Sequence, residues 1–347
     1  MKLVDVREAA GLVLVHDITE IAKDPDRKHT AFHRGHVVTE DDIPRLLDIG
    51  KQNLYVHELS PDAVHENDGA LRLAQAIAGS GITLGEPREG KVKLAATDDG
   101  AVVVDAEGLA ELNGPGDIIC VTRRTYSPVR AGDTVAGVRV MPLFTDEPTV
   151  ATAERIARSR DGLVEVRPLR RFSVGLVVTG SEVLTGRIED AFGPVMEKKM
   201  AELGSDVAAR LFSDDKPEDV ERAIRSHLAD GHDLIIVTGG MSVDPDDRTP
   251  GAISAVASRV GFQWAPVLPG CMTMLAAAES PVTGDEVPII GVPACGIHHD
   301  RTLLDILLAR LVAGEFPTAD EVRGFGHGGL CLECEECTFP NCTFGSV

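Results

Sequence analysis

The chain has 347 residues, which is enough for two domains with sizeable cores, and its 43% hydrophobic and 26% charged residues are typical of a globular protein. The 34 basic and 55 acidic residues give a formal net charge of −21, and aromatic residues make up only 4%, which argues against nucleic acid and anionic membrane as main partners. No targeting segment or transmembrane stretch is visible, so a cytoplasmic protein is expected.

The first half of the chain mixes helical and strand patterns and predicts a strand-rich α+β domain over residues 1–165. Apolar residues recur at helical spacing at about 40–49, 68–78 and 147–160, and a glycine follows each of these segments. Strands are expected at 54–56, 118–122 and 135–140. Residues 91–96 and 101–105 flank the turn Asp98-Asp99-Gly100, so they are expected to pair as a β-hairpin.

The second half alternates apolar runs with amphipathic segments, which predicts an α/β domain at about 170–315. Strands are expected at 173–179, 207–212, 234–237 and 287–292, and helices at 191–203, 217–229, 249–259 and 301–312. Nearly continuous apolar strands are typical of parallel sheets that helices cover on both faces. The alternation therefore predicts a doubly wound, mostly parallel sheet with right-handed crossovers.

Three of these strands end in loops rich in glycine and small polar residues, at the edge where open α/β sheets bind ligands. The loops are 179–183, 238–250 and 291–296, with Leu268-Pro269-Gly270 between the last two. In the middle loop, Gly239-Gly240 allows a sharp turn and a close approach of backbone to ligand. A solvated βα loop would explain one such segment, whereas several at one edge favour a ligand site.

The middle loop leads into a helix whose start is marked by Thr249, expected as its cap, and by Pro250. A helix N-terminus favours a bound anion such as a phosphate. Asp244, Asp246 and Asp247 precede this helix. Carboxylates beside a phosphate need a cation between them, so Mg²⁺ is an expected companion.

These loops resemble the molybdopterin-binding domain shared by the MogA and MoeA proteins of molybdenum cofactor assembly. Residues 174–198, which contain Thr179-Gly180-Ser181-Glu182, resemble the opening strand and helix of that family. Residues 238–250 resemble its Gly-Gly loop and the aspartate that follows. The resemblance covers about residues 170–315, and the first half of the chain carries a fainter likeness to MoeA.

The resemblance implies a site in which loop backbone and hydroxyl groups hold the pterin phosphate, with acidic residues near Mg²⁺ or an adenylated intermediate. The residues expected to bind the ligand are Thr179, Gly180, Ser181, Glu182, Thr238, Gly239, Gly240, Ser242, Asp247, Thr249, Pro269 and Gly270, and those expected in catalysis are Asp247, Asp244 and Glu182. MoeA proteins tend to have a lysine where this chain has Leu268, and Gly-Asn-Pro where it has Ala294-Cys295-Gly296. These departures weaken the expectation of metal insertion more than that of a pterin site.

The segment 325–347 carries a second pattern, formed by Cys331, Cys334, Cys337 and Cys342. Four thiolates at this spacing predict a metal-binding tail, which holds either structural Zn²⁺ or a [4Fe–4S] cluster. The consecutive residues His298-His299-Asp300 are interpreted as the start of a helix capped by Asp300 rather than as a metal site. Cys271 and Cys295 are expected to be small buried fillers.

Three functions are compatible with these motifs. The first is an enzyme of cofactor assembly that adenylates molybdopterin with ATP, or exchanges its AMP group for molybdate or tungstate. The second is a carrier or sensor of the cofactor, with a molybdo- or tungsto-enzyme as its client. The third is a hydrolase of nucleotide pyrophosphates, because the loop from Gly239 to Asp247 also resembles the CinA proteins. By analogy with the family, the chain is a candidate homo-oligomer.

Overall fold

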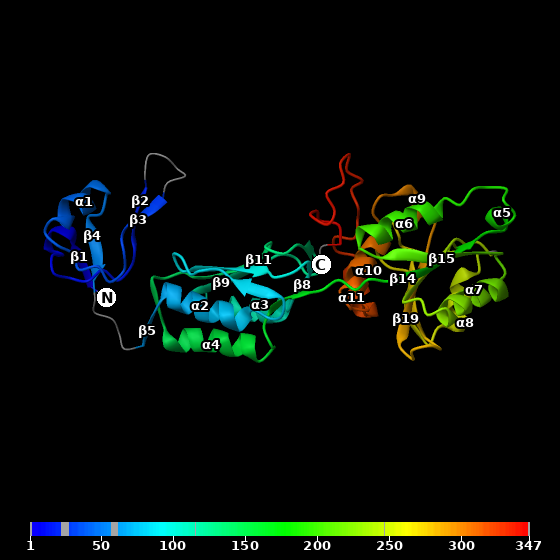
Figure 1. The fold of residues 1–347 in the computed structure, drawn as a ribbon, viewed down its shortest axis with the longest axis horizontal. Helices are drawn as coiled ribbons and strands as arrows, with labels where there is room; N and C mark the ends of the chain where they lie inside the picture. Colours follow the sequence, from blue (N-terminus) through cyan, green and yellow to red (C-terminus); the bar gives the residue numbers. More distant parts are fainter. Residues whose placement is uncertain (1, 22–27, 57–61, 115, 246, 346–347) are drawn as a thin grey trace.

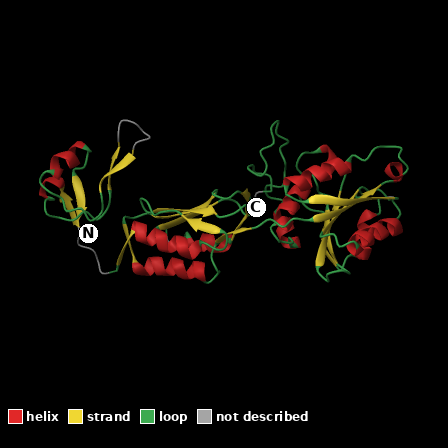
Figure 2. Ribbon diagram, viewed as in Figure 1, coloured by secondary structure: helices red, strands yellow, loops and turns green. Residues whose placement is uncertain are grey.

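The computed structural model describes the chain except residues 1, 22–27, 57–61, 115, 246 and 346–347, and Figures 1 and 2 show three bodies in a row. The first body holds residues up to Val56, the second runs from Asp62 to Arg167, and the third holds the rest of the described chain. Each body has its own cluster of buried apolar residues. None of the described helices is long and apolar enough to cross a membrane.

The first body is a small assembly of short elements around a few buried aliphatic side chains. Its elements are β1 (Lys2–Asp5), the 3-10 helix η1 (Val6–Glu8), β2 (Ile18–Ile21), β3 (Lys28–Phe32), α1 (Asp42–Asp48) and β4 (Asn53–Val56). β1 pairs with β4 and β2 pairs with β3, both antiparallel. The predicted helix at 40–49 and strand at 54–56 are confirmed as α1 and β4, and Leu46 and Leu54 turn inward from them.

The second body packs helices against a four-stranded antiparallel sheet of order β6-β7-β11-β9. α2 lies against β7 and β11, and α4 lies against α2 (Figure 1). The elements are β5 (Ala63–His65), α2 (Glu66–Ile77), β6 (Ile82–Leu84), β7 (Lys91–Ala96), β8 (Gly100–Val104), α3 (Ala106–Leu112), β9 (Ile118–Thr122), β10 (Pro128–Val129), β11 (Thr134–Val140), β12 (Phe144–Asp146), α4 (Glu147–Arg158) and β13 (Val164–Arg167).

The predicted hairpin of residues 91–96 and 101–105 is wrong, although both strands exist. β7 already has β6 and β11 on its two edges, and β8 lies in a separate sheet between β10 and β13. A Cβ atom at Gly100 would come within 2.4 Å of the Arg167 carbonyl oxygen, so glycine allows β13 to approach. The turn is instead bound to a distant loop, because Asp99 accepts a hydrogen bond of 2.9 Å from the Ala131 N–H.

The third body is an α/β domain with a six-stranded sheet of order β15-β14-β16-β19-β18-β17. Among its described strands only β18 runs against the others, so the predicted doubly wound, mostly parallel sheet is confirmed. The elements are β14 (Ser173–Thr179), α5 (Ser181–Leu184), α6 (Phe192–Glu202), β15 (Asp206–Ser213), α7 (Pro217–Ala229), β16 (Leu234–Thr238), α8 (Thr249–Val256), β17 (Arg259–Gln263), β18 (Met274–Glu279), β19 (Glu286–Val292), α9 (Cys295–His298), α10 (Leu303–Val312) and α11 (Ala319–Gly324).

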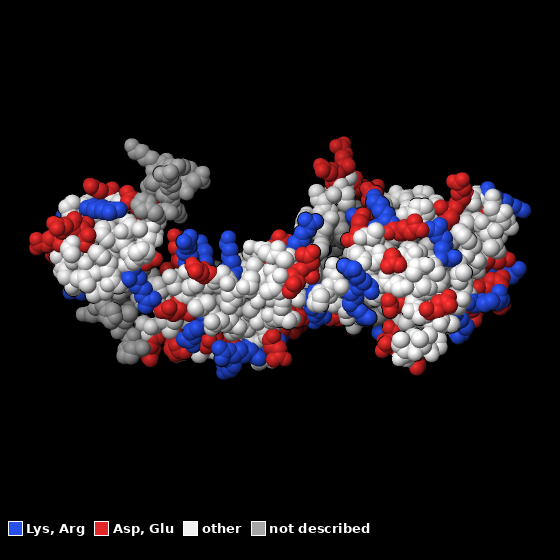
Figure 3. Space-filling view, viewed as in Figure 1, with Lys and Arg blue, Asp and Glu red and all other residues white. Residues whose placement is uncertain are grey.

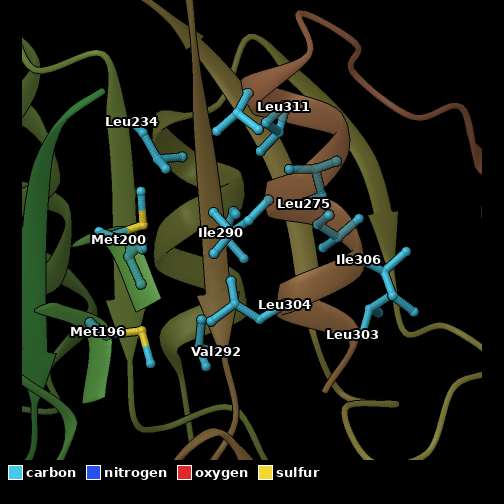
Figure 4. Close-up of a cluster of buried hydrophobic side chains, with 14 of the residues drawn as sticks. Met196, Met200, Leu234, Leu275, Ile290, Val292, Leu303, Leu304, Ile306 and Leu311 are labelled. Carbon is cyan, nitrogen blue, oxygen red and sulfur yellow. The ribbon is translucent and has the colours of Figure 1, made fainter. Parts of the chain in front are cut away.

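Side chains from alternate strand positions form two apolar layers on opposite faces of this sheet. Leu176 belongs to the layer under α6 and α10, and Val177 belongs to the layer under α7 and α8. Figure 4 shows the first layer, where Leu304 and Leu311 of α10 point toward Ile290 of β19. Burial on both faces explains why these strands are apolar throughout.

Acidic and basic side chains are interspersed on the face of the molecule shown in Figure 3. The excess of acidic residues is therefore spread over this face rather than gathered into one patch. Many of the charges are paired. The Arg72 guanidinium, for example, contacts Glu147 at 2.6 Å and Glu154 at 2.8 Å. Such partly exposed pairs each contribute little to stability.

Candidate functional site

The carboxyl ends of β16 and β19 and the loop before β18 surround a pocket of about 600 Å³. This volume suits a small-molecule ligand. Six of the residues predicted from the sequence line the pocket: Gly239, Gly240, Ser242, Asp247, Pro269 and Gly270. The reversed strand β18 explains how the Pro269-Gly270 loop reaches this edge, because a strand that runs backwards starts where its neighbours end.

The Gly-Gly turn has a backbone that other residues would strain. Gly239 has φ +88° and Gly240 has φ +59°, both in the left-handed region. A Cβ atom at Gly239 would lie 2.6 Å from the Thr179 hydroxyl and 2.9 Å from the Thr179 carbonyl oxygen. A Cβ atom at Gly240 would lie 2.5 Å from the Thr249 hydroxyl. The two glycines therefore let the loop lie directly on β14 and on the start of α8.

Thr179 lies directly beneath the Gly-Gly turn. Its side chain is only 6% exposed, and its hydroxyl oxygen has no hydrogen-bond partner among the described residues. Buried polar groups are nearly always paired, and an unpaired one costs free energy. The hydroxyl lies beneath Gly239 and Gly240, and Thr179 is not among the residues that line the pocket, so this unpaired group belongs to the packing under the turn.

Ser242 and Asp247 fix the shape of the middle loop. The Ser242 N–H donates to an Asp247 carboxylate oxygen at 2.7 Å, and the Asp247 N–H donates to the Asp244 carbonyl at 2.9 Å. Asp244 is exposed and does not line the pocket, and Asp246 lies outside the described residues. Of the three predicted aspartates, the structure therefore places Asp247 at the pocket.

Thr249 and Thr238 support the loop from below rather than face the pocket. Thr249 is the first residue of α8, and Arg248 occupies the cap position, so the predicted capping role of Thr249 is wrong. Its N–H donates to the Gly240 carbonyl at 3.2 Å, and its side chain packs under Gly240. The Thr238 hydroxyl donates to the Val177 carbonyl at 3.3 Å within the sheet.

The loop after β14 lies beside the pocket without lining it. Gly180, with φ +134°, turns the chain into the short helix α5, which carries the exposed Ser181 and Glu182. The Ser181 N–H donates to the Asp215 carboxylate at 3.1 Å, so this loop is tied to the loop after β15. The structure thus separates these three predicted residues from the six that meet in the pocket.

Several pocket residues were not predicted as site residues, among them Phe192, Cys271, Cys295 and His299. Cys271 and Cys295 are partly exposed, so their interpretation as buried fillers is wrong. Burial raises the pKa of the Cys295 thiol, and the nearby Cys271 raises it further. Their positions next to Gly270 and after β19 were the only signal in the sequence.

A buried ion pair holds the segment that carries Cys295 and His299. The Lys199 ammonium donates to Asp305 at 2.7 and 2.9 Å and to the Asp300 carbonyl at 2.7 Å. Asp305 and Thr302 form a capping box that begins α10, so the predicted cap at Asp300 is wrong. Helix α6 is thereby fixed to the chain between the pocket and α10.

The side chains that line the pocket provide little positive charge to stabilise a bound anion. No lysine or arginine occurs among the described residues that line it, and Asp247 adds a carboxylate. Met241, Leu268 and Met272 make much of the remaining wall apolar. An apolar group that carries a phosphate would therefore suit the pocket if a cation accompanied the phosphate.

A second group of potential metal ligands lies at the opposite edge of the sheet. One ligand atom each from His227, Asp230 and His232 lies within 4.8 Å of the others. Both rings already contact β14, since His227 Nε2 lies 3.2 Å from the Leu176 carbonyl and His232 Nδ1 lies 3.0 Å from the Ser173 hydroxyl. These contacts give the two histidines a structural role in tying α7 to the sheet.

The buried His227 should make the folded chain sensitive to acid. Burial lowers the pKa of His227 from its ordinary value of 6.5. The unfolded chain then binds a proton more readily than the folded chain, so this stability is present above about pH 6.5 and is lost as the pH falls toward the lowered pKa. We expect His227→Gln to flatten the pH dependence of urea unfolding on the acid side, whereas the exposed His327→Gln should retain it. Equal pH dependence in both variants would contradict this.

Comparison with known proteins supports the resemblance in the third body. The profile of a family described as "Probable molybdopterin binding domain" matches residues 175–310, and that of a domain of unknown function matches residues 3–58. A CinA-like protein of Mycobacterium sp. (strain MCS) is 40% identical over 85 residues, which are 24% of this chain and 20% of that protein. The chain thus spans about a fifth of the length of the curated relatives that it matches.

Two solved structures of low identity also align. The molybdopterin biosynthesis enzyme MoaB from Thermus thermophilus is 22% identical with a TM-score of 0.34, covering 42% of this chain and 98% of that one. The tungsten cofactor synthesizing protein MoaB from Pyrococcus furiosus is 17% identical with a TM-score of 0.30, covering 36% and 82%. It is the family profile that covers all three strand-end loops. Residues 175–310 therefore belong to the molybdopterin-binding domain family.

Proposed function

We propose that this protein binds molybdopterin in the pocket at the ends of β16 and β19 and acts in the assembly of the molybdenum or tungsten cofactor. The observation that carries the proposal is the pocket itself, which gathers the Gly239-Gly240 turn, Ser242 and Asp247 in a domain of the matching family. The apolar wall suits the pterin ring, and the turn suits its phosphate.

Mg²⁺ is the proposed companion of the phosphate. The lining residues include a carboxylate and no lysine or arginine, so a bound phosphate would face uncompensated negative charge. We propose Asp247 as the side chain that would hold such a cation, because it lines the pocket and a hydrogen bond from the Ser242 N–H fixes its carboxylate. Catalysis in this arrangement would consist of positioning and charge neutralisation around the phosphate.

We propose adenylation of molybdopterin by ATP, or exchange of the adenylate for molybdate or tungstate, as the activity, with a non-catalytic carrier as the alternative in the same pocket. The test is a titration of the full chain, purified so that any metal bound by the tail cysteines is retained, with metal-free molybdopterin in the presence of Mg·ATP. Binding with formation of adenylate and pyrophosphate supports the enzyme. Binding without turnover supports the carrier or a metal-insertion step, and absence of binding contradicts the proposal.

A second candidate function is hydrolysis of a nucleotide pyrophosphate. The observation in its favour is the 40% identity to CinA-like proteins over 85 residues. Incubation with a dinucleotide pyrophosphate such as NAD and Mg²⁺, followed by analysis of the nucleotide products, tests it. Hydrolysis of NAD by a chain that does not bind molybdopterin would favour this second function. Recovery of intact NAD would argue against it.

Replacing Asp247 by asparagine should separate binding from the action of the cation. Asparagine can still accept from the Ser242 N–H, so the loop should keep its shape while one negative charge is lost. We expect molybdopterin affinity to fall on the order of tenfold in Mg²⁺, equivalent to about 1.4 kcal/mol, and to change little in chelator. The matched control is Asp285→Asn in an exposed loop away from the pocket. Equal affinity of both variants in Mg²⁺ would contradict the role of Asp247.

A further inference from the structure

All four cysteines of the tail line the same cavity. Cys331, Cys334, Cys337 and Cys342 all line a hollow of about 290 Å³ after α11. Cys331 and Cys342 are partly buried against the core of the third body, whereas Cys334 and Cys337 are exposed. The described tail has no regular helix or strand over these residues. The part of the cavity wall that carries the cysteines is therefore an irregular loop.

The spacing of the sulfur atoms distinguishes a cluster from a single ion. Tetrahedral zinc bonds each thiolate at about 2.3 Å, which brings every pair of sulfurs to about 3.8 Å. Within the described residues, no three cysteine sulfurs lie within 4.8 Å of one another. A zinc tetrathiolate is also a closed site, whereas the four cysteines of this tail line an open cavity together with residues such as His298 and Phe344. In a [4Fe–4S] cluster each thiolate binds a different iron, so the sulfurs stand farther apart around a larger body.

We infer that the tail cysteines hold a [4Fe–4S] cluster and that this cluster site shares a wall with the pterin pocket. The first half of the inference stands on the close sequence spacing of Cys331, Cys334 and Cys337 and on the cavity that all four cysteines line. The second half, the shared wall, stands on backbone contacts between the tail and the pocket. Only its test by molybdopterin affinity rests on the proposed function.

Backbone hydrogen bonds join the tail to the pocket wall. The Leu268 N–H donates to the Gly329 carbonyl at 2.8 Å, and the Cys331 N–H donates to the Leu268 carbonyl at 2.8 Å. Leu268 directly precedes Pro269 and Gly270 of the pocket, and Cys331 is the first tail cysteine. A movement of the cluster ligand would therefore pass to the pocket loop through two hydrogen bonds.

A side-chain contact makes a second connection. His299 lines both the pterin pocket and the tail cavity, and its Nδ1 lies 3.0 Å from the carboxylate of Glu333, between the first two cysteines. The far end of the tail is fixed as well, because Phe344 is buried in the core and the Gly345 N–H donates to the Gly328 carbonyl at 3.0 Å. Both ends of the tail are thus fixed to the third body, and the segment between them that carries Cys334 and Cys337 is exposed.

The test of the cluster is chemical analysis of the full chain purified without oxygen from cells supplied with iron. We expect about four irons and four acid-labile sulfides per chain, with the visible absorption of a cubane cluster and an EPR signal after reduction. One zinc per chain without sulfide would overturn the inference, as would a chain that contains neither metal. Cys334→Ser should lose the cluster without unfolding, because Cys334 is exposed, and Glu336→Gln in the same exposed segment is the matched control.

Hydrogen exchange tests the shared wall without any pterin. We expect the amides of Leu268 and Cys331 to exchange more slowly in the cluster-loaded chain than in Cys334→Ser, and to be unchanged in Glu336→Gln. Equal exchange in all three proteins would overturn the shared wall and leave the cluster standing.

Molybdopterin affinity is the second readout. We expect it to fall on the order of tenfold when the cluster is lost, within the usual range for coupled sites. Unchanged affinity would overturn the coupling. If no form of the protein binds molybdopterin, the proposed function fails, while the iron and exchange measurements still decide this inference.

Discussion

Replacing Gly239 by alanine is expected to lower molybdopterin affinity by at least about tenfold and to lower the free energy of unfolding by about 1–2 kcal/mol. The new Cβ atom would overlap the Thr179 carbonyl and hydroxyl oxygens, and φ at this position is +88°. The turn would have to move away from β14, and with it the backbone that faces the ligand. Binding is measured by titration with molybdopterin, and stability by urea unfolding followed by circular dichroism.

Gly251→Ala is the matched control for this change. Gly251 lies in α8, close to the same loop, and a Cβ atom there would meet nothing within 4 Å. Alanine is a better helix former than glycine, so this variant should be more stable by up to about 1 kcal/mol and should bind molybdopterin normally. Wild-type binding by Gly239→Ala would show that the Gly-Gly turn does not face the ligand.

The largest loss of stability is expected from Lys199→Met, which should lower the free energy of unfolding by about 3–5 kcal/mol. Lys199 and Asp305 have side chains only 6% and 4% exposed, with an N–O distance of 2.7 Å. Removing the ammonium leaves the Asp305 carboxylate buried with less compensation. Because Lys199 also holds the Asp300 carbonyl, the segment that carries Cys295 and His299 should loosen, and hydrogen exchange there should rise.

Lys198→Met controls for the loss of a lysine on the same helix, since Lys198 is exposed and should cost less than about 0.5 kcal/mol. The double change of Lys199→Met and Asp305→Leu tests the mechanism, because it removes both charges. It should recover part of the stability lost in the single variant, although the α10 cap is lost with Asp305. A single variant within about 1 kcal/mol of the wild type would contradict the prediction.

Local signals in the sequence predict the parallel part of the third body closely. The run Ser173–Thr179 is apolar because both faces of β14 are covered, and the bounds of α7 follow from Pro217 at its start and from its apolar stripe. Glycines that must turn with positive φ, such as Gly239 and Gly240, mark the loop that lines the pocket. These features depend on residues that are close together in the sequence, so they can be predicted without knowledge of the fold.

Other features depend on partners that are distant in the sequence. The segment Met274–Glu279 has the composition Met-Leu-Ala-Ala-Ala-Glu, which favours a helix, and it becomes a strand only because β19 pairs with it. The failed hairpin of β7 and β8 has the same origin, since each strand finds its partners elsewhere. Cys271 and His299 enter the pocket from segments that the sheet order brings together.

In the tail, too, the sequence predicts some features, whereas others depend on the fold. The spacing of its cysteines predicts a metal site, because the ligands are close in sequence. The cavity that the four cysteines line, and the contact of His299 with Glu333, follow only from how residues 328–345 fold back on the third body.

The pairing of Leu268 with Leu330 also sets an order of events during protein synthesis. A ribosome delivers the Gly-Gly turn, the Pro269-Gly270 loop and β19 well before Leu330, so the α/β sheet can form while one side of the pocket loop still lacks its neighbour. The loop gains its last backbone partners only when the cysteine segment emerges. Ligand capture by the nascent chain would therefore come after, and depend on, synthesis of the segment that carries the four cysteines.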